Sequence, residues 1–334
     1  MTRVVPVVGY LILVILTILL FSLATFEALQ LGPVAGVVMA LTIVMMVYMM
    51  ARDGLDMLRT KMVHTFSRVD LNNFLSVFIG AIVTFTLSVN LGLGAVTAAG
   101  LVAIVAALII PKYGVPIYCG AFVGMASDKL LCQHGSLALA GVLGGIVYVL
   151  TTGVLDGFGG KLGTIAFTGC ILAGLIVGRE FVVLPVPTWD VAWLIVLYSV
   201  IGTVATFYLS VNLDHGAVMG SGIVGLAGGL ILPALHPGIG GTLAVMVICA
   251  SFAGMSAVKR FPSIAPMFPA GVLCGLFFIY SMPYLGGAGG KLGTIAFGSV
   301  IAVRGVMELW AYVHGLERGK VLSTSPSQHT RNVH

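Results

Sequence analysis

The sequence predicts an all-α polytopic membrane protein, and three observations lead to that fold class. Hydrophobic residues make up 59% of the chain and charged residues only 8%, with a mean hydropathy of +1.13. Soluble domains are far more polar than this. The chain also contains many apolar runs of about helix length, and several blocks of its sequence occur twice.

The apolar runs are long enough to be spanning helices. A helix needs about 20 apolar residues to cross a bilayer, and lipid offers no partners to free backbone groups, so such runs must be helical. We count about twelve runs, near residues 5–26, 33–51, 72–91, 94–111, 115–127, 136–155, 162–178, 189–211, 216–233, 239–257, 267–283 and 292–313. The first run lacks a convincing small-residue cleavage site, so we expect a retained helix and not a signal peptide.

The repeated blocks indicate an internal duplication. The block GGKLGTIAF at 159–167 returns at 289–297, and CGAFVGMASDK from Cys119 and AGVLGG from Ala140 return in similar form at the same offset of 130 residues. TFTLSVNLGLGAV from Thr84 returns as TFYLSVNLDHGAV from Thr206. We therefore expect four regions. They are an N-terminal helix pair with a charged cytoplasmic connector (1–69), two homologous five-helix repeats (70–185 and 186–313) and a disordered cytoplasmic tail (314–334).

The distribution of basic residues predicts the orientation. Lys and Arg cluster after the second run, at Lys259 and Arg260, and in the C-terminal tail, and such clusters favour the cytoplasm. With twelve spans, both termini lie in the cytoplasm of a multi-pass protein of the cell membrane (the cell inner membrane). Five spans per copy make the two repeats inverted. If 115–127 and 242–257 are re-entrant instead, the copies are parallel; we favour inversion because the second of these segments is long enough to cross.

The two GGKLGT turns are the principal candidate binding elements. Each places two glycines, a lysine and a threonine at a helix N-terminus, where free amides and the helix dipole favour an anion. Glycine is a poor helix former and lysine is disfavoured at that end, so helix stability does not explain the pattern. The predicted solute-binding residues are Gly160, Lys161, Thr164, Gly290, Lys291, Thr294, Asn90 and Asn212. A lysine reaching from a glycine turn into the membrane interface is the alternative. In a fully spanning inverted fold the two turns would lie on opposite faces instead of forming one site.

The second pair of candidate elements is the interrupted helices at SVNLGLG and SVNLDHG. Helix breaks expose carbonyl oxygens, which in secondary transporters coordinate Na⁺ or the polar groups of a solute. The predicted coupling-ion residues are Ser88, Ser210 and Asp214, the last present in one copy only. A simple Asn cap and turn Asp at the membrane surface is the competing interpretation.

Other motifs argue against several classes of function. The five cysteines lie mostly in apolar runs without a metal or disulfide spacing, so we expect no metal and no cofactor other than Na⁺ as coupling ion. The CxxFxGM blocks, with small residues at close spacing, favour helix packing over a path for a thiophilic solute. No phosphate-binding loop, HExxH or GxSxG is present, so we do not expect an enzyme.

These observations predict a secondary active transporter that moves a small anionic solute by alternating access, coupled to Na⁺ or H⁺. The alternatives are a channel or facilitated-diffusion pore for a small polar solute, and a membrane subunit of a larger complex. The expected partners are the solute and the lipid bilayer, with no nucleic acid. The sequence leaves homo-oligomer formation open.

Overall fold

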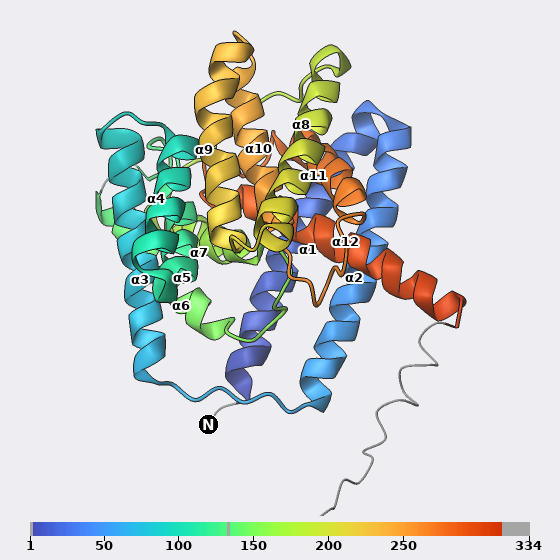
Figure 1. The fold of residues 1–334 in the computed structure, drawn as a ribbon, viewed down its shortest axis with the longest axis horizontal. Helices are drawn as coiled ribbons and strands as arrows, with labels where there is room; N and C mark the ends of the chain where they lie inside the picture. The colour runs from blue at the N-terminus through green and yellow to red at the C-terminus, as the bar shows by residue number, and fades with distance from the viewer. Residues whose placement is uncertain (1–2, 132–133, 316–334) are drawn as a thin grey trace, which may run out of the picture.

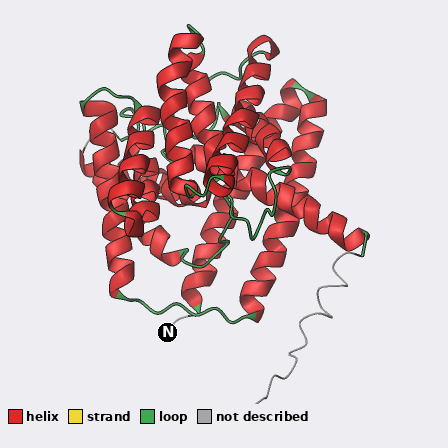
Figure 2. Cartoon of the chain, viewed as in Figure 1, coloured by secondary structure: helices red, strands yellow, loops and turns green. Residues whose placement is uncertain are grey.

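The computed structural model describes residues 3–131 and 134–315, so most of the predicted tail lies outside the described residues. The described chain is helical with connecting loops (Figure 2) and has one isolated antiparallel bridge, between Val182 and Gly286. Its α-helices are α1 (Val4–Leu31), α2 (Pro33–Arg59), α3 (Arg68–Phe85), α4 (Ala95–Ile109), α5 (Gly114–Gly124), α6 (His134–Leu150), α7 (Lys161–Val177), α8 (Trp189–Phe207), α9 (Ala217–Leu235), α10 (Gly240–Gly254), α11 (Met267–Ser281) and α12 (Lys291–Val313).

Six of these helices are long and apolar enough to cross a membrane. They are α1, α2, α3 with its π-helical extension, α8 with its extension, α9 and α12. The other helices have 17 residues or fewer, short of the roughly 20 that a full span needs. The structure therefore agrees with a helical membrane protein, but the expected twelve spans are not confirmed. The short run at 115–127 forms an 11-residue helix.

Both SVN segments form π-helical turns, η1 (Thr86–Asn90) and η3 (Tyr208–Asn212). Each turn continues the preceding helix and ends before a loop whose last residue, Gly94 or Gly216, has a positive φ. A π-turn holds one extra residue and often marks a functional position in a helix. The sequence analysis correctly expects the helices to break here.

The N-terminal helices pack against the C-terminal part of the chain. Gly32 is extended and Pro33 starts α2, so α1 and α2 form a hairpin. Phe21 of α1 stacks on Phe277 of α11, with ring centroids 3.8 Å apart. The helices α2 and α12 approach closely at Gly305, where an added Cβ would lie 2.3 Å from the Met45 carbonyl oxygen.

The short helices α5 and α10 are enclosed by the rest of the protein. Nearly all of their side chains are buried. A Cβ on Gly120 of α5 would lie 2.0 Å from the Val77 carbonyl oxygen of α3, and one on Gly254 of α10 would lie 2.5 Å from the Thr203 carbonyl oxygen of α8. Small residues thus let each short helix approach a long one closely, as expected for the CxxFxGM blocks.

Candidate functional site

The two GGKLGT turns touch each other. A Cβ on Gly163 would lie 2.4 Å from the Cα of Gly293, and one on Gly160 would lie 2.3 Å from the Gly293 carbonyl oxygen. The reciprocal contact is also present: a Cβ on Gly290 of the second turn would lie 2.3 Å from the carbonyl oxygen of Gly163 in the first. The N-termini of α7 and α12 therefore meet at one place and do not lie on opposite faces of the molecule.

This contact explains the glycines differently from the sequence analysis. Gly160 and Gly290 both adopt left-handed backbone conformations, with φ of 82° and 86°, which glycine tolerates without steric strain. Together with Gly163 and Gly293 they allow the two backbones to pack without side chains between them. The glycines are required by this helix contact, and close approach of a ligand is not needed to account for them.

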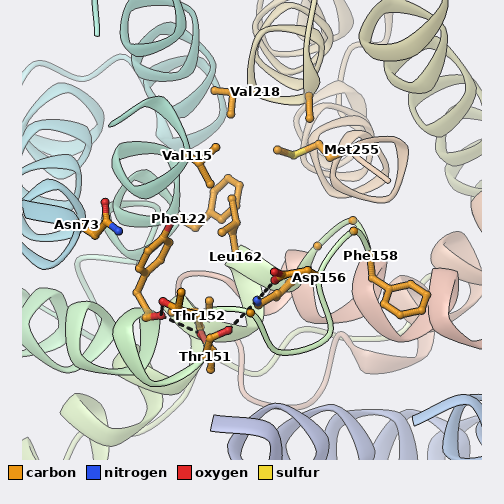
Figure 3. A pocket seen from close by; sticks show the side chains of 18 residues that line it. Asn73, Val115, Phe122, Thr151, Thr152, Asp156, Phe158, Leu162, Val218 and Met255 are labelled. Carbon is orange, nitrogen blue, oxygen red and sulfur yellow. Dashed lines mark hydrogen bonds and ion pairs between the residues drawn. The ribbon is translucent and has the colours of Figure 1, made fainter. Parts of the chain in front are cut away.

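The lysine of the first turn lines a cavity of about 300 Å³, which we call the Lys161 cavity (Figure 3). Its ammonium group donates to the Thr151 carbonyl oxygen at 2.8 Å and forms an ion pair with Asp156, with 2.5 Å between Lys161 Nζ and Asp156 Oδ1. The Lys161 side chain is 12% exposed and that of Asp156 is 45% exposed. Lys161 is thus neutralised by a carboxylate from its own turn.

The lysine of the second turn lines a separate cavity of about 530 Å³, which we call the Lys291 cavity. Lys291 is 8% exposed, and its ammonium group donates to the carbonyl oxygens of Ser281 and Tyr284, both at 2.6 Å. No carboxylate of the described residues lies within 4.0 Å of this ammonium group. Asp128 lines the same cavity, but it is exposed and accepts a bond from the Ser127 hydroxyl.

The two lysine turns differ mainly in this one carboxylate. Thr151 and Ser281, which hold the lysines through their carbonyl oxygens, are related by the offset of 130 residues, as are Leu155 and Leu285, which both have a positive φ. At that offset Asp156 corresponds to Gly286. The backbone is therefore alike in both turns, while the charge beside the lysine is not.

The second turn is also held from α1. The Tyr284 hydroxyl donates to Glu27 Oε2 at 2.7 Å, and this hydrogen bond raises the pKa of Tyr284. The phenol is protonated at neutral pH and donates to the Glu27 carboxylate. Because the carbonyl of the same residue holds Lys291, the bond to Glu27 helps to fix the lysine in its cavity.

An aromatic contact at the centre of the molecule lies between the two cavities. Phe122 of α5 lines both cavities, and Phe252 of α10 lines the Lys291 cavity. The two rings lie 4.3 Å apart between centroids, and Tyr118 packs on Phe122 at 4.4 Å. The Tyr118 hydroxyl is 2.8 Å from Ser221 Oγ, which is 2.7 Å from Ser251 Oγ. This buried chain ties α5, α9 and α10 together around the aromatic contact.

The two cavities extend toward opposite ends of α3. Asn73, near the start of that helix, lines the Lys161 cavity, whereas Ser88, in the π-turn after its far end, lines the Lys291 cavity. At 1.5 Å per residue these positions are about 22 Å apart along the axis. Asp156 also lines a third, charged cavity together with Thr60 of the 60–67 connector. The Lys161 cavity therefore adjoins the connector side of the molecule.

The other predicted site residues lie outside these contacts. Thr164 and Thr294 are fully buried and line neither lysine cavity. Asn90, Asn212 and Asp214 are exposed at the helix breaks. The structure therefore brings Lys161 and Lys291 close to cavities but does not gather all the predicted solute-binding residues around them.

The predicted coupling-ion residues have local partners. The carbonyl oxygens of Ser88 and Ser210 accept bonds from the amides of Gly94 and Gly216, at 3.2 and 3.3 Å. Ser88 lines the Lys291 cavity, while Ser210 is buried and is not among the residues that line either lysine cavity. The coupling-ion role stays a prediction.

Sequence reasoning missed three contributors to the cavities. Phe122 and Phe252 belong to a repeated block that it assigned to packing, and Asp156 is not among its predicted site residues. Comparison of the two copies position by position contains the signal for Asp156, because it is opposite Gly286 in an otherwise similar turn. No sequence signal indicates that Phe122 and Phe252 meet.

We compared the chain with protein-family models, curated proteins and solved structures, and none of them matches it.

Proposed function

We propose that this protein is a secondary active transporter that moves a small anionic solute across a membrane by alternating access. One observation carries the proposal: two cavities, each lined by the lysine of a GGKLGT turn, share Phe122 in their walls, and Phe122 packs on Phe252. A route interrupted at its centre, with a cavity on each side, has the geometry that alternating access requires. The proposal includes no catalytic step and no cofactor other than a coupling ion.

The anionic character of the solute follows from the charge in the cavities. A buried ammonium group is costly unless a negative charge accompanies it. Lys161 has such a partner in Asp156, but Lys291 is held only by two carbonyl oxygens. A solute that brings a negative charge to Lys291 would supply the counter-charge that no residue in 3–131 or 134–315 places within 4.0 Å of it.

We further propose that 70–185 and 186–313 are inverted copies. The proposal is supported by the order of their elements, since each contains a helix with a π-turn followed by a short central helix and a GGKLGT turn. In Figure 1, α3 starts at the end of the molecule where the connector lies, whereas α8 starts near the opposite end. Opposed first helices are what an odd number of crossings per copy would produce.

The proposed orientation places both termini and the 60–67 connector in the cytoplasm of a cell membrane. It is supported by a group of basic residues on the connector side. Arg260 forms an ion pair with Asp53 of α2 at 2.6 Å, and Arg304 bonds to the Arg260 carbonyl oxygen. Basic residues at one end of the spans favour the cytoplasmic side. Coupling to Na⁺ or H⁺, with Ser88, Ser210 and Asp214 as the ion-binding residues, remains part of the proposal.

Counterflow in proteoliposomes tests this function. Vesicles that contain the purified full chain are loaded with one unlabelled anion and diluted into the same labelled anion, using acetate, hexanoate, benzoate, benzenesulfonate, sulfate and phosphate in turn. We expect trans-stimulated, saturable uptake of at least one anion above the rate of protein-free liposomes. Transport without trans-stimulation would support the pore instead, and no protein-dependent flux of any anion would contradict both.

Matched lysine variants test whether counterflow depends on Lys161 and Lys291. Lys161→Met and Lys291→Met should each reduce counterflow at least about tenfold, because each removes a charged hydrogen-bond donor from the route. Lys112→Met is the control, since Lys112 is exposed and lines neither lysine cavity. Unchanged flux in both cavity variants would remove the basis of the proposal.

A further inference from the structure

We propose that the solute bound in the Lys291 cavity is a monocarboxylate with an apolar body, such as a short-chain aliphatic or an aromatic acid. This inference rests on the proposed transport function and specifies its substrate class. Three features support it: the Asp156 carboxylate that lies beside Lys161 in the other turn, the buried Lys291 ammonium group, and the apolar walls of the Lys291 cavity.

The Lys161 turn shows how a carboxylate is held beside a lysine of this kind. Lys161 Nζ lies 2.5 Å from Asp156 Oδ1 while also donating to the Thr151 carbonyl oxygen. In the Lys291 turn, Ser281 supplies the corresponding carbonyl, but Gly286 stands at the position of Asp156. The direction of a side chain at residue 286 is filled by the Val182 carbonyl oxygen, which would lie 2.2 Å from an added Cβ. A carboxylate from solution would therefore pair with Lys291 from the cavity that this lysine lines.

The charge of the cavity favours a monoanion. Lys291 is the one basic residue among the residues that line it, and the acidic residue there, Asp128, is exposed. Sulfate at neutral pH, with two negative charges, would leave one charge without a partner in a largely buried site, which is unfavourable. One carboxylate on one ammonium group matches in charge and in hydrogen bonding.

The walls of the cavity favour an apolar body on that anion. Besides Lys291 and a few serines, the side chains around it are mostly apolar or aromatic, and they include Val96, Phe122, Val245, Phe252, Phe278 and Ile295. A volume of about 530 Å³ falls within the range of small-molecule sites. Such walls gain from burying hydrocarbon and offer few donors to a fully polar oxyanion.

Binding of hexanoate to the purified full chain tests the inference by isothermal titration calorimetry. Hexanol has the same hydrocarbon chain without the charge, and sulfate has charge without a hydrocarbon chain. We expect hexanoate to bind at least about tenfold more tightly than either. Lys291→Met should weaken hexanoate binding about tenfold to a hundredfold, whereas Lys112→Met, at an exposed lysine that lines neither lysine cavity, should change it less than about threefold.

A second pair of variants leaves both lysines in place, in case Lys291→Met fails to fold. Ala95 and Ala217 are the first residues of α4 and α9, and they line the Lys291 and Lys161 cavities respectively. Ala95→Leu narrows the Lys291 cavity and should weaken hexanoate binding at least about fivefold, and Ala217→Leu should not.

The outcomes separate this inference from the proposed function. Lys291-dependent binding of sulfate in preference to hexanoate would overturn the monocarboxylate assignment and leave anion transport standing. Equal binding of hexanoate and hexanol, unaffected by Lys291→Met, would also overturn it. Loss of counterflow for every anion, with hexanoate binding intact, would instead overturn transport and leave a carboxylate-binding site.

Discussion

Gly163 of α7 and Gly293 of α12 lie in direct contact, with only 2.4 Å between an added Cβ on the first and the Cα of the second. Each glycine is two residues beyond a lysine that lines its own cavity. The two lysine turns are therefore in direct contact.

A methyl group at this contact should destabilise the protein. Gly163→Ala overpacks two backbones that cannot separate without moving α7 or α12, and we expect a loss of about 1–3 kcal/mol. Gly241→Ala is the control, because Gly241 lies in α10 with nothing within 4 Å of an added Cβ, and its effect should stay below about 1 kcal/mol. Thermal unfolding of the detergent-solubilised variants measures both. Equal unfolding midpoints for the two variants would show that the turns do not pack as described.

Removal of the Asp156 carboxylate should make the Lys161 cavity responsive to anions. Asp156→Asn leaves Lys161 without its ion pair. Because Asp156 is 45% exposed, solvent screens this pair, and the free energy of unfolding should fall by about 1 kcal/mol. Added acetate should restore the unfolding midpoint of this variant by binding Lys161. The double variant Asp156→Asn with Lys161→Met is the control, and an equal acetate effect in it would refute the assignment.

The hydroxyl chain of Tyr118, Ser221 and Ser251 should behave as one unit. Ser221→Ala leaves the fully buried Tyr118 hydroxyl without its bond, at a cost of about 1–3 kcal/mol. Tyr118→Phe removes that hydroxyl, so the double variant should be more stable than the sum of the single losses by at least about 0.5 kcal/mol. Chemical denaturation of the four proteins completes the cycle. Strict additivity would mean that the two side chains do not interact.

Truncation of the central aromatic contact should make the route leak. Phe122→Ala removes the ring that separates the cavities, and we expect efflux of benzenesulfonate from loaded vesicles without trans-stimulation. Phe277→Ala is the matched control, since both rings are 1% exposed. Each substitution leaves a cavity in the core and should cost about 3–5 kcal/mol of stability. Phe277, however, packs against Phe21 and lines neither lysine cavity. Leakage through both variants would point to general destabilisation.

The sequence predicted the helical class and the helix breaks because both depend on local signals. Apolar runs and the Gly-rich ends of SVNLGLG and SVNLDHG are visible in a single chain. The meeting of Phe122 with Phe252, by contrast, depends on how α5 and α10 pack, which no local pattern reveals. Composition alone does not give the number of spans, because a buried apolar helix of 11 residues such as α5 has the same composition as part of a membrane span.

The glycines of the GGKLGT turns also show where a local pattern has two structural explanations. Glycine next to a lysine at a helix N-terminus is compatible with close approach of a ligand and with close approach of another helix. Gly160 contacts α12 and Gly290 contacts α7, so packing accounts for them. Both lysines line cavities, which agrees with the need of a charged side chain in an apolar interior for a partner or a polar space; their role in solute binding stays a prediction.

The most direct test of two cavities with access from opposite sides is labelling by a membrane-impermeant thiol reagent. Ala95→Cys and Ala217→Cys, placed separately in a background without the native cysteines, report on the Lys291 and Lys161 cavities. We predict that the reagent reaches Cys at 95 from one side of sealed, oriented vesicles and Cys at 217 from the other, and that a transported anion changes the two rates in opposite directions. Labelling of both positions from the same side would contradict alternating access through these cavities.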